Sequence, residues 1–128
     1  MTHETELTTE VDLCTPDGSR LNRAALGWSR RPLHRANLEG CFGINKRWDY
    51  WAILAGDWSI AVVYADVDYL GIAEVWWCHL PTGETGGRAA NVPGARGISH
   101  PDLPGSAPLR YQSSKIELAL TDDGDGTT

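Results

Sequence analysis

The segment Lys46-Arg47-Trp48-Asp49-Tyr50-Trp51 interleaves two cations and one carboxylate with three aromatic side chains. In an extended strand successive side chains point to opposite faces, so Asp49 would share a face with Arg47 and Trp51. Such residues could form a polar cluster at the floor of a pocket with aromatic walls. They could also form a structural ion pair beneath aromatic packing, with Asp49 paired to Arg47 or to Arg30. We favour the ion pair as the default interpretation.

A ligand site built on this segment would draw on the basic region before it and on a later strand. Trp76 and Trp77 are adjacent, so one indole would lie on each face of a strand. An exposed indole would also suit stacking on sugars or contact with a partner protein. The expected ligand-binding residues are Arg30, Lys46, Trp48, Asp49, Tyr50, Trp51 and Trp76, and no catalytic residue is identified.

The sequence offers little else that could perform chemistry. Asp66 and Asp68 would share a strand face, but His79 lacks the spacing of a metal-binding pair, so we expect no metal site. Neither a nucleophile elbow nor a glycine-rich phosphate-binding motif is present, and we expect no cofactor. His34 and His100 fall in irregular regions, where we expect them to be solvated.

Charge is segregated along the chain, whose formal net charge is −6. Residues 20–47 contain seven cations and one anion, whereas residues 48–84 contain six anions and no lysine or arginine. A basic patch could bind nucleic acid. The complementary charge is already present, however, so we favour a basic arm lying against an acidic sheet and expect no nucleic-acid partner.

The cysteines and the first residues indicate a reducing compartment. Cys14, Cys41 and Cys78 are widely spaced and odd in number, which argues against a disulfide framework. Residues 1–10 have neither a basic region nor an apolar run, and no segment is long and apolar enough to span a membrane. We therefore expect a cytoplasmic protein, and nothing in the sequence indicates its oligomeric state.

The elements that must position these side chains are predicted to be mostly β-strands. Residues 46–54, 58–69 and 72–80 are rich in aromatic and β-branched residues and are separated by short breaks, which predicts an antiparallel meander. Residues 113–120 alternate between apolar and polar side chains and predict a further half-buried strand. Residues 81–108 contain five prolines and six glycines and predict a long loop.

We expect one β domain over residues 11–121, in which residues 11–45 form an extended N-terminal arm. Residues 1–10 read as a disordered tail, and residues 122–128 as a disordered or truncated end. The composition of residues 122–126 is that of a hairpin turn, which expects a returning strand. The four predicted strands would leave open edges, so the sheet is expected to be part of a β-barrel or sandwich in a larger domain.

Four motifs resemble the family called domain of unknown function 2804. They are Gly27-Trp28-Ser29-Arg30-Arg31-Pro32-Leu33, Asn37-Leu38, Lys46-Arg47-Trp48-Asp49-Tyr50-Trp51 and Asp66-Val67-Asp68-Tyr69-Leu70-Gly71. The similarity runs from about residue 13 to residue 121. The resemblance implies members more than twice this length, of which the chain would be the first part, and a loose lipocalin-like relationship with a cavity for an apolar ligand. It implies no activity and no catalytic residue.

Two functions of different classes are consistent with these features. The first is binding of a small apolar or amphipathic ligand in an aromatic-lined β cavity, with a lyase- or hydratase-like activity left open. The second is a non-catalytic carbohydrate-binding or interaction module that presents tryptophans on an open face.

Overall fold

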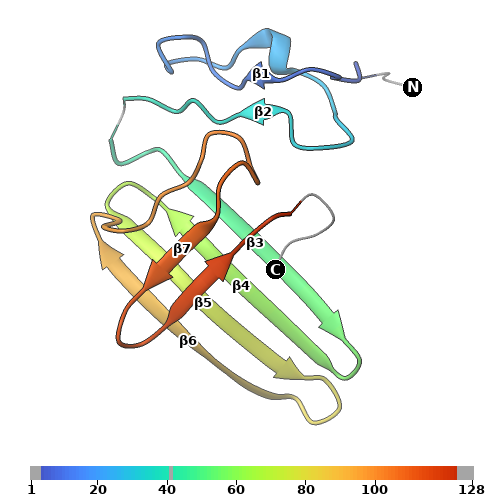
Figure 1. The fold of residues 1–128 in the computed structure, drawn as a ribbon, viewed down its shortest axis with the longest axis vertical. Helices are drawn as coiled ribbons and strands as arrows, with labels where there is room; N and C mark the ends of the chain where they lie inside the picture. Colours follow the sequence, from blue (N-terminus) through green and yellow to red (C-terminus); the bar gives the residue numbers. More distant parts are fainter. Residues whose placement is uncertain (1–3, 41, 124–128) are drawn as a thin grey trace.

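The structure, a computed structural model, describes residues 4–40 and 42–123 and is built from three small sheets (Figure 1). The largest is a four-stranded antiparallel sheet in the order β3-β4-β5-β6. Its strands are β3 (Arg47–Ala55), β4 (Trp58–Asp66), β5 (Leu70–His79) and β6 (Glu84–Pro93). The predicted mostly-β antiparallel meander is therefore confirmed, and the sheet is open at both edges rather than closed into a barrel.

Short turns connect the strands of this meander. Ala55 pairs directly with Trp58, so β3 and β4 are joined by two residues, and the first of them, Gly56, has a φ of 59°. Glycine adopts such a positive φ without steric cost. Asp68, in the turn between β4 and β5, has a φ of 67°, and its carboxylate accepts hydrogen bonds from the backbone N–H groups of Gly43 at 2.6 Å and Asn45 at 3.0 Å. This contact ties the end of the arm to the sheet.

Strand β6 is the main departure from the predicted secondary structure, because it lies inside the segment predicted to be a loop. A Cβ atom on Gly86 would lie 2.6 Å from Cζ2 of Trp77, and one on Gly87 would lie 2.5 Å from the carbonyl oxygen of Val75. Glycine is needed here because β5 and the Trp77 ring approach the β6 backbone too closely for a side chain. Gly86 and Gly87, which suggest a loop by composition, therefore lie where β6 packs closely against β5 and the Trp77 ring.

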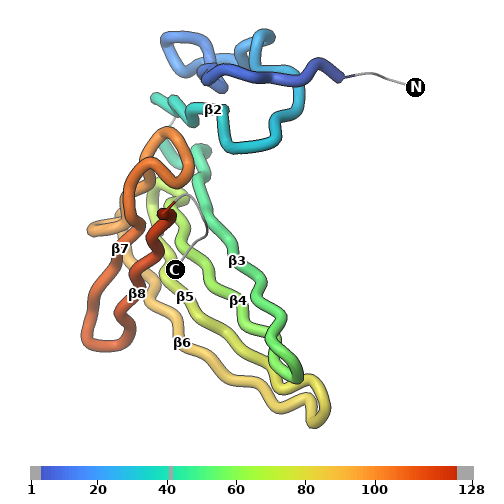
Figure 2. The backbone as a smooth tube through the Cα atoms, turned by 45° about the vertical axis from the view of Figure 1, so that its right-hand side comes forward, coloured from blue at the N-terminus to red at the C-terminus, as the bar shows by residue number. Residues whose placement is uncertain are grey.

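A second antiparallel pair, β7 (Leu109–Gln112) and β8 (Glu117–Leu120), crosses one face of the sheet (Figure 2). We call this the inner face. The predicted strand over residues 113–120 is confirmed at its C-terminal half, whereas β7 was not expected from the sequence. The core lies between the hairpin and the sheet, where Tyr64 is only 1% exposed. Other buried members of this core are Val62, Ala73, Ala95, Ile98, Leu109 and Leu118.

The opposite face of the sheet, which we call the outer face, has no covering layer among the described residues. Trp48, Tyr50 and Trp76 lie on it, opposite Ala65, Val63 and Ala61 of β4 respectively. These three aromatic side chains are 63%, 59% and 39% exposed. One sheet therefore has a packed face and an exposed aromatic face.

The N-terminal arm forms a separate layer beyond the end of the sheet (Figure 1). Its short strands β1 (Val11–Asp12) and β2 (His34–Arg35) pair in parallel, and a single 3₁₀ turn, η1 (Arg23–Ala25), lies between them in the sequence. The extended arm follows the prediction, but the disordered tail does not: within residues 4–10, the N–H of Leu7 donates to the carbonyl of Trp28 at 2.8 Å. Residues 1–3, where the predicted tail begins, and residues 124–128, in the predicted hairpin turn and end, lie outside the described residues.

Two cations of the arm, Arg30 and Arg35, pair with acids of the arm, whereas the charge pattern predicts pairing with the acidic meander. Arg30 contacts Glu6 at 2.7 Å, and Arg35 contacts Asp12 at 3.4 Å and Glu10 at 3.9 Å. The complementary charges are local because the N-terminal residues fold back along the arm. No helix among the described residues is long and apolar enough to cross a membrane.

Candidate functional site

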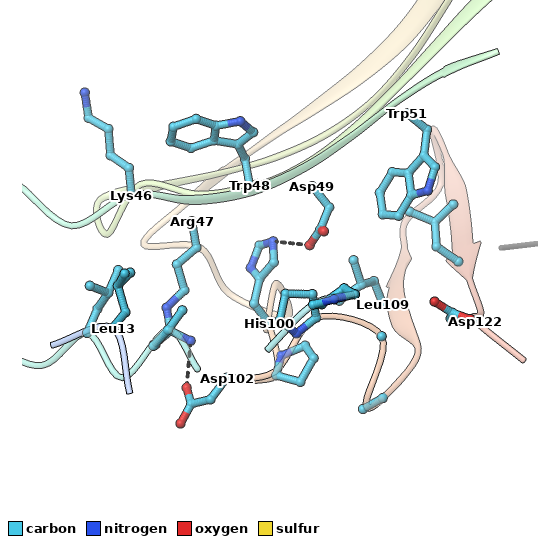
Figure 3. A pocket seen from close by; sticks show the side chains of 18 residues that line it. Leu13, Lys46, Arg47, Trp48, Asp49, Trp51, His100, Asp102, Leu109 and Asp122 are labelled. Atoms are coloured by element: carbon cyan, nitrogen blue, oxygen red, sulfur yellow. Dashed lines mark hydrogen bonds and ion pairs between the residues drawn. The ribbon is translucent and has the colours of Figure 1, made fainter. Parts of the chain in front are cut away.

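A cavity of about 340 Å³ lies where the arm, the start of β3 and the hairpin β7–β8 meet (Figure 3). Its volume is within the range of small-molecule sites. The apolar part of its wall comes from all three layers, and the polar part comes from Lys46 and β3, from the loop that leads to β7, and from Asp122 after β8. The lining residues are Leu13, Pro32, Ala36, Leu38, Lys46, Arg47, Trp48, Asp49, Trp51, His100, Pro101, Asp102, Pro104, Gly105, Ala107, Leu109, Leu120 and Asp122.

Alternation along β3 decides which of its side chains point into the cavity. Arg47, Asp49 and Trp51 lie on the inner face, toward the hairpin and the loop before it. Lys46 and Trp48 contribute to the rim, and their side chains extend to the other side of the strand (Figure 3). The strand pattern read from the sequence is thus correct in placing Arg47, Asp49 and Trp51 together.

Asp49 and His100 form the polar pair of the cavity. The Nε2 atom of His100 lies 3.4 Å from Oδ2 of Asp49 and 3.1 Å from the carbonyl oxygen of Tyr64. Burial raises the pKa of Asp49 above its usual 3.8, although the nearby His100 acts in the opposite direction. Burial also lowers the pKa of His100 below its usual 6.5, although the Tyr64 carbonyl and Asp49 oppose this shift. Both shifts favour the uncharged form, as expected for partly buried groups.

Tyr64 positions His100 from the core side. Its hydroxyl accepts a hydrogen bond from the N–H of Ser99 at 2.9 Å and donates to the carbonyl of Arg110 at 3.1 Å. The rings of Tyr64 and His100 meet edge to face, with centroids 4.9 Å apart. Burial raises the pKa of Tyr64, so its hydroxyl stays protonated and available as a donor. The core thereby anchors a loop that its composition marks as irregular.

Arg47 closes the cavity on the side of the arm. Its Nη1 atom contacts Oδ1 of Asp102 at 3.1 Å, and its Nη2 atom donates to the carbonyl of Ala36. The N–H of Ala36 in turn donates to the carbonyl of Asp102 at 2.7 Å. The predicted pairing of Asp49 with Arg47 or Arg30 is therefore wrong. Arg47 connects the arm to the loop before β7, and Asp49 pairs with His100 instead.

The structure brings together only part of the predicted ligand-binding set. Lys46, Trp48, Asp49 and Trp51 all line the cavity. The remaining three lie elsewhere. Tyr50 and Trp76 project from the outer face, and Arg30 lies in the arm, where it pairs with Glu6 and stacks over the Trp28 ring at 5.0 Å.

His100 and Asp102 are site residues that sequence reasoning missed, and His100 was wrongly expected to be solvated. Its side chain is only 6% exposed. Nothing in the local sequence distinguishes it from a surface histidine, because its burial depends on the distant Tyr64 and on the packing of the loop. His34, also expected to be solvated, is half-buried, and its Nε2 atom lies 2.8 Å from the carbonyl oxygen of Ala25.

The carboxylates and imidazole considered for a metal do not come together. Asp66 and Asp68 lie at the end of β4 nearest the arm, whereas His79 pairs with Trp58 at the opposite end of the sheet. Asp68 is engaged by backbone N–H groups, and His79 lies 2.8 Å from the hydroxyl of Thr82. Within residues 4–40 and 42–123, no group of three or more potential ligands could hold a metal ion.

Comparison with known proteins identifies the family of this chain but assigns no activity to it. The model of the domain of unknown function DUF2804 matches residues 4–128, and the chain therefore belongs to that family. The resemblance expected over residues 13–121 is confirmed and extends further at both ends. No curated protein and no solved structure matches the chain. The function must therefore be argued from the site itself.

Proposed function

We propose that this member of the DUF2804 family binds a small amphipathic molecule in the cavity between the arm, β3 and the β7–β8 hairpin. The observation that supports this most strongly is the composition of the wall, which is largely apolar and carries a few polar groups: the Asp49–His100 pair, the Arg47–Asp102 ion pair, Lys46 at the rim and Asp122. Apolar walls with a few fixed polar groups are typical of ligand sites. At the ~30 Å³ that a water molecule occupies in the liquid, the cavity admits a ligand of about eleven non-hydrogen atoms.

The size of the cavity limits the affinity that such a ligand can reach. Burying about 200 Å² of apolar surface contributes about 5 kcal/mol at ~25 cal/mol per Å². The loss of translational and rotational freedom opposes this gain. We therefore expect dissociation constants of about 0.2 mM or weaker for probes that fill the cavity, and tighter binding for a natural ligand that also engages the polar pairs.

Trp51 provides a signal for this binding, since its indole lies on the inner face and lines the cavity. Titration with geraniol, an eleven-atom amphipathic alcohol, should change the tryptophan fluorescence saturably. The change should be largely lost in Trp51→Phe and retained in Trp48→Phe, whose indole projects away from the cavity. An absence of binding by calorimetry as well as by fluorescence would rule out the proposed function.

Any lyase- or hydratase-like reaction in this cavity would use the Asp49–His100 pair. These two side chains face one another in the cavity, and their pKa values shift toward each other because of burial. Side chains with such shifts at a concave site are candidates for proton transfer. No other residue of the cavity is assigned a catalytic role, so ligand binding is the stronger proposal.

The second candidate, carbohydrate binding, is supported by a different observation on the outer face. Trp48 and Tyr50 lie two residues apart along the edge strand β3, and Trp76 lies on the same face with Glu74 beside it in the β5 strand pattern. Exposed aromatic rings near a carboxylate are suited to stacking on sugars and bonding their hydroxyls. Titration with cellohexaose should then alter fluorescence in a way that Trp76→Ala abolishes and Trp51→Phe does not. Lack of any response would exclude this candidate.

A further inference from the structure

One ring nitrogen of His100 has no hydrogen-bond partner, although it is buried. Among the side-chain nitrogen and oxygen atoms of the described residues, Nδ1 of His100 is the one found buried without a partner. The side chain as a whole is 6% exposed and forms part of the cavity wall. A buried polar atom that has lost its water without a replacement is destabilising, so such atoms call for an explanation.

The contacts of the other nitrogen determine what Nδ1 can do. Nε2 lies near two acceptors, the carbonyl oxygen of Tyr64 at 3.1 Å and the carboxylate of Asp49 at 3.4 Å. It must therefore carry the ring proton and donate it. In the neutral imidazole the second nitrogen is then an acceptor with a free lone pair. Tyr64 packs edge to face against one side of the imidazole, with ring centroids 4.9 Å apart.

The remaining polar groups of the wall cannot readily receive an anionic head group. The Arg47 guanidinium is already engaged by Asp102 and by the carbonyl of Ala36. Asp49, Asp102 and Asp122 add carboxylates to the same wall. An anion would approach three carboxylates while the nearest guanidinium is already paired, and this is unfavourable at a partly buried site. An ammonium group that donated to Nδ1 would lie near the Arg47 guanidinium, which acts electrostatically on His100, so an uncharged donor fits best.

We propose that the ligand of this cavity is an amphipathic alcohol, whose hydroxyl donates a hydrogen bond to Nδ1 of His100 after a small rotation of the imidazole ring. This inference rests on the proposed function and specifies the chemistry of its ligand. The alkyl or terpenoid body lies against the apolar wall, formed by Leu13, Leu38, Trp51, Leu109 and Leu120. Nδ1 gains the donor that no described residue supplies.

Protonation of His100 should remove the preference for alcohols. A protonated imidazole carries hydrogens on both nitrogens and accepts no hydrogen bond. Because the pKa of His100 lies below its usual 6.5, the acceptor persists at neutral pH and is lost only on further acidification. The charged or titratable groups that act on His100 are Asp49 and Arg47 from β3 and Tyr64 and Asp66 from β4.

The test compares three probes of similar length: 1-nonanol, the ether 1-methoxyoctane, which has the same number of chain atoms, and nonanoate. Binding to the complete chain is measured by calorimetry at pH 7.5. We expect the alcohol to bind roughly five- to tenfold more tightly than the ether, the value of one hydrogen bond, and more tightly than the carboxylate. His100→Phe should abolish the difference between alcohol and ether. His100→Gln, which restores an acceptor oxygen, should retain part of it.

Acidification of the unaltered chain gives the same comparison without a substitution. We expect the ratio of alcohol to ether affinity to approach one as His100 becomes protonated. If the ether binds as tightly as the alcohol at pH 7.5, or if nonanoate binds most tightly, the cavity function stands and the assignment of an alcohol is wrong. If none of the three probes binds, both the proposed function and this inference are wrong.

Discussion

The two faces of the four-stranded sheet both carry aromatic residues, and the tyrosines on them differ sharply in burial. Tyr64 on the inner face is 1% exposed, whereas Tyr50 on the outer face is 59% exposed. The two tyrosines lie on neighbouring strands, and Tyr50 pairs directly with Val63, the residue before Tyr64. What separates them is the hairpin β7–β8 and the loop before it, which cover one face only. Residue type alone therefore does not determine the role of an aromatic side chain in this sheet.

The most direct way to test this contrast is to truncate the two tyrosines. Tyr64→Ala should lower the free energy of unfolding by about 3–5 kcal/mol, since it opens a cavity in the core and removes the hydroxyl that binds Ser99 and Arg110. Tyr50→Ala should cost less than about 1 kcal/mol. Urea denaturation of both variants measures the difference. Equal losses would mean that the outer face is also packed in solution.

A steric change should separate the faces at β6. Gly86→Val places a side chain against the Trp77 ring on the inner face, and we expect a loss of roughly 1–3 kcal/mol because the ring must move. Ala89→Val adds similar bulk to the outer face, where Ala89 is exposed, and should change stability by less than about 0.5 kcal/mol. Thermal unfolding provides the comparison. A neutral Gly86→Val would show that Trp77 does not pack across β6.

The same contrast can be made with two adjacent cations at the start of β3. Arg47→Ala removes contacts to Asp102 and to the carbonyl of Ala36 and should destabilise the chain by about 1–2 kcal/mol. Lys46→Ala, whose exposed side chain lies on the other side of the strand, should have an effect near zero. The arm should also become more accessible to proteolysis in the Arg47 variant alone. Matching digestion rates would contradict the role of Arg47 in holding the arm.

The smallest expected effect is a dependence of stability on pH. The unfolded chain binds a proton at His100 near pH 6.5, whereas the folded chain resists it because burial lowers the pKa. His100 therefore makes the folded state less stable as pH falls below 6.5, until the folded pKa is reached. Asp49, whose pKa is raised, acts with the opposite sign nearer its usual 3.8.

His100→Gln should flatten the decrease in unfolding free energy between pH 7 and pH 5.5. The parent chain measured in the same buffers is the reference. An unchanged slope would show that His100 titrates alike in the folded and unfolded chain, and it would weaken the argument for a buried neutral imidazole.

The fold could be predicted where local composition and tertiary packing agree. Strands β3, β4 and β5 follow directly from their β-branched and aromatic residues, and the alternation of β3 correctly placed Asp49 and Trp51 on one face. Strand β6 could not be predicted, because Gly86 and Gly87 read as strand breakers unless the position of Trp77 is known. The contact between β6 and Trp77 cannot be inferred from the local sequence alone.

Of the candidate site, only the residues on and next to β3 could be predicted from the sequence. Its β3 residues were expected, but His100 lies in a proline-rich loop, and its burial depends on a hydroxyl 36 residues away in sequence. The ion pairs could not be predicted either, because Arg47 pairs with Asp102, which is distant in sequence, and not with the nearby Asp49. Pairing partners are decided by which segments meet in space, and this depends on the hairpin crossing the sheet.

The cavity wall is contributed by residues from nearly the whole length of the chain, and this has a kinetic consequence. Leu13 of the arm and Leu120 of β8 are more than one hundred positions apart, yet both line the same space. Contacts of such high sequence separation are costly in loop-closure entropy and slow to form. The meander, whose strands pair with their sequence neighbours, can form first, and the cavity last. A ligand that binds only the complete cavity would then stabilise the native state after the rate-limiting step of folding. It would slow unfolding more than it speeds folding.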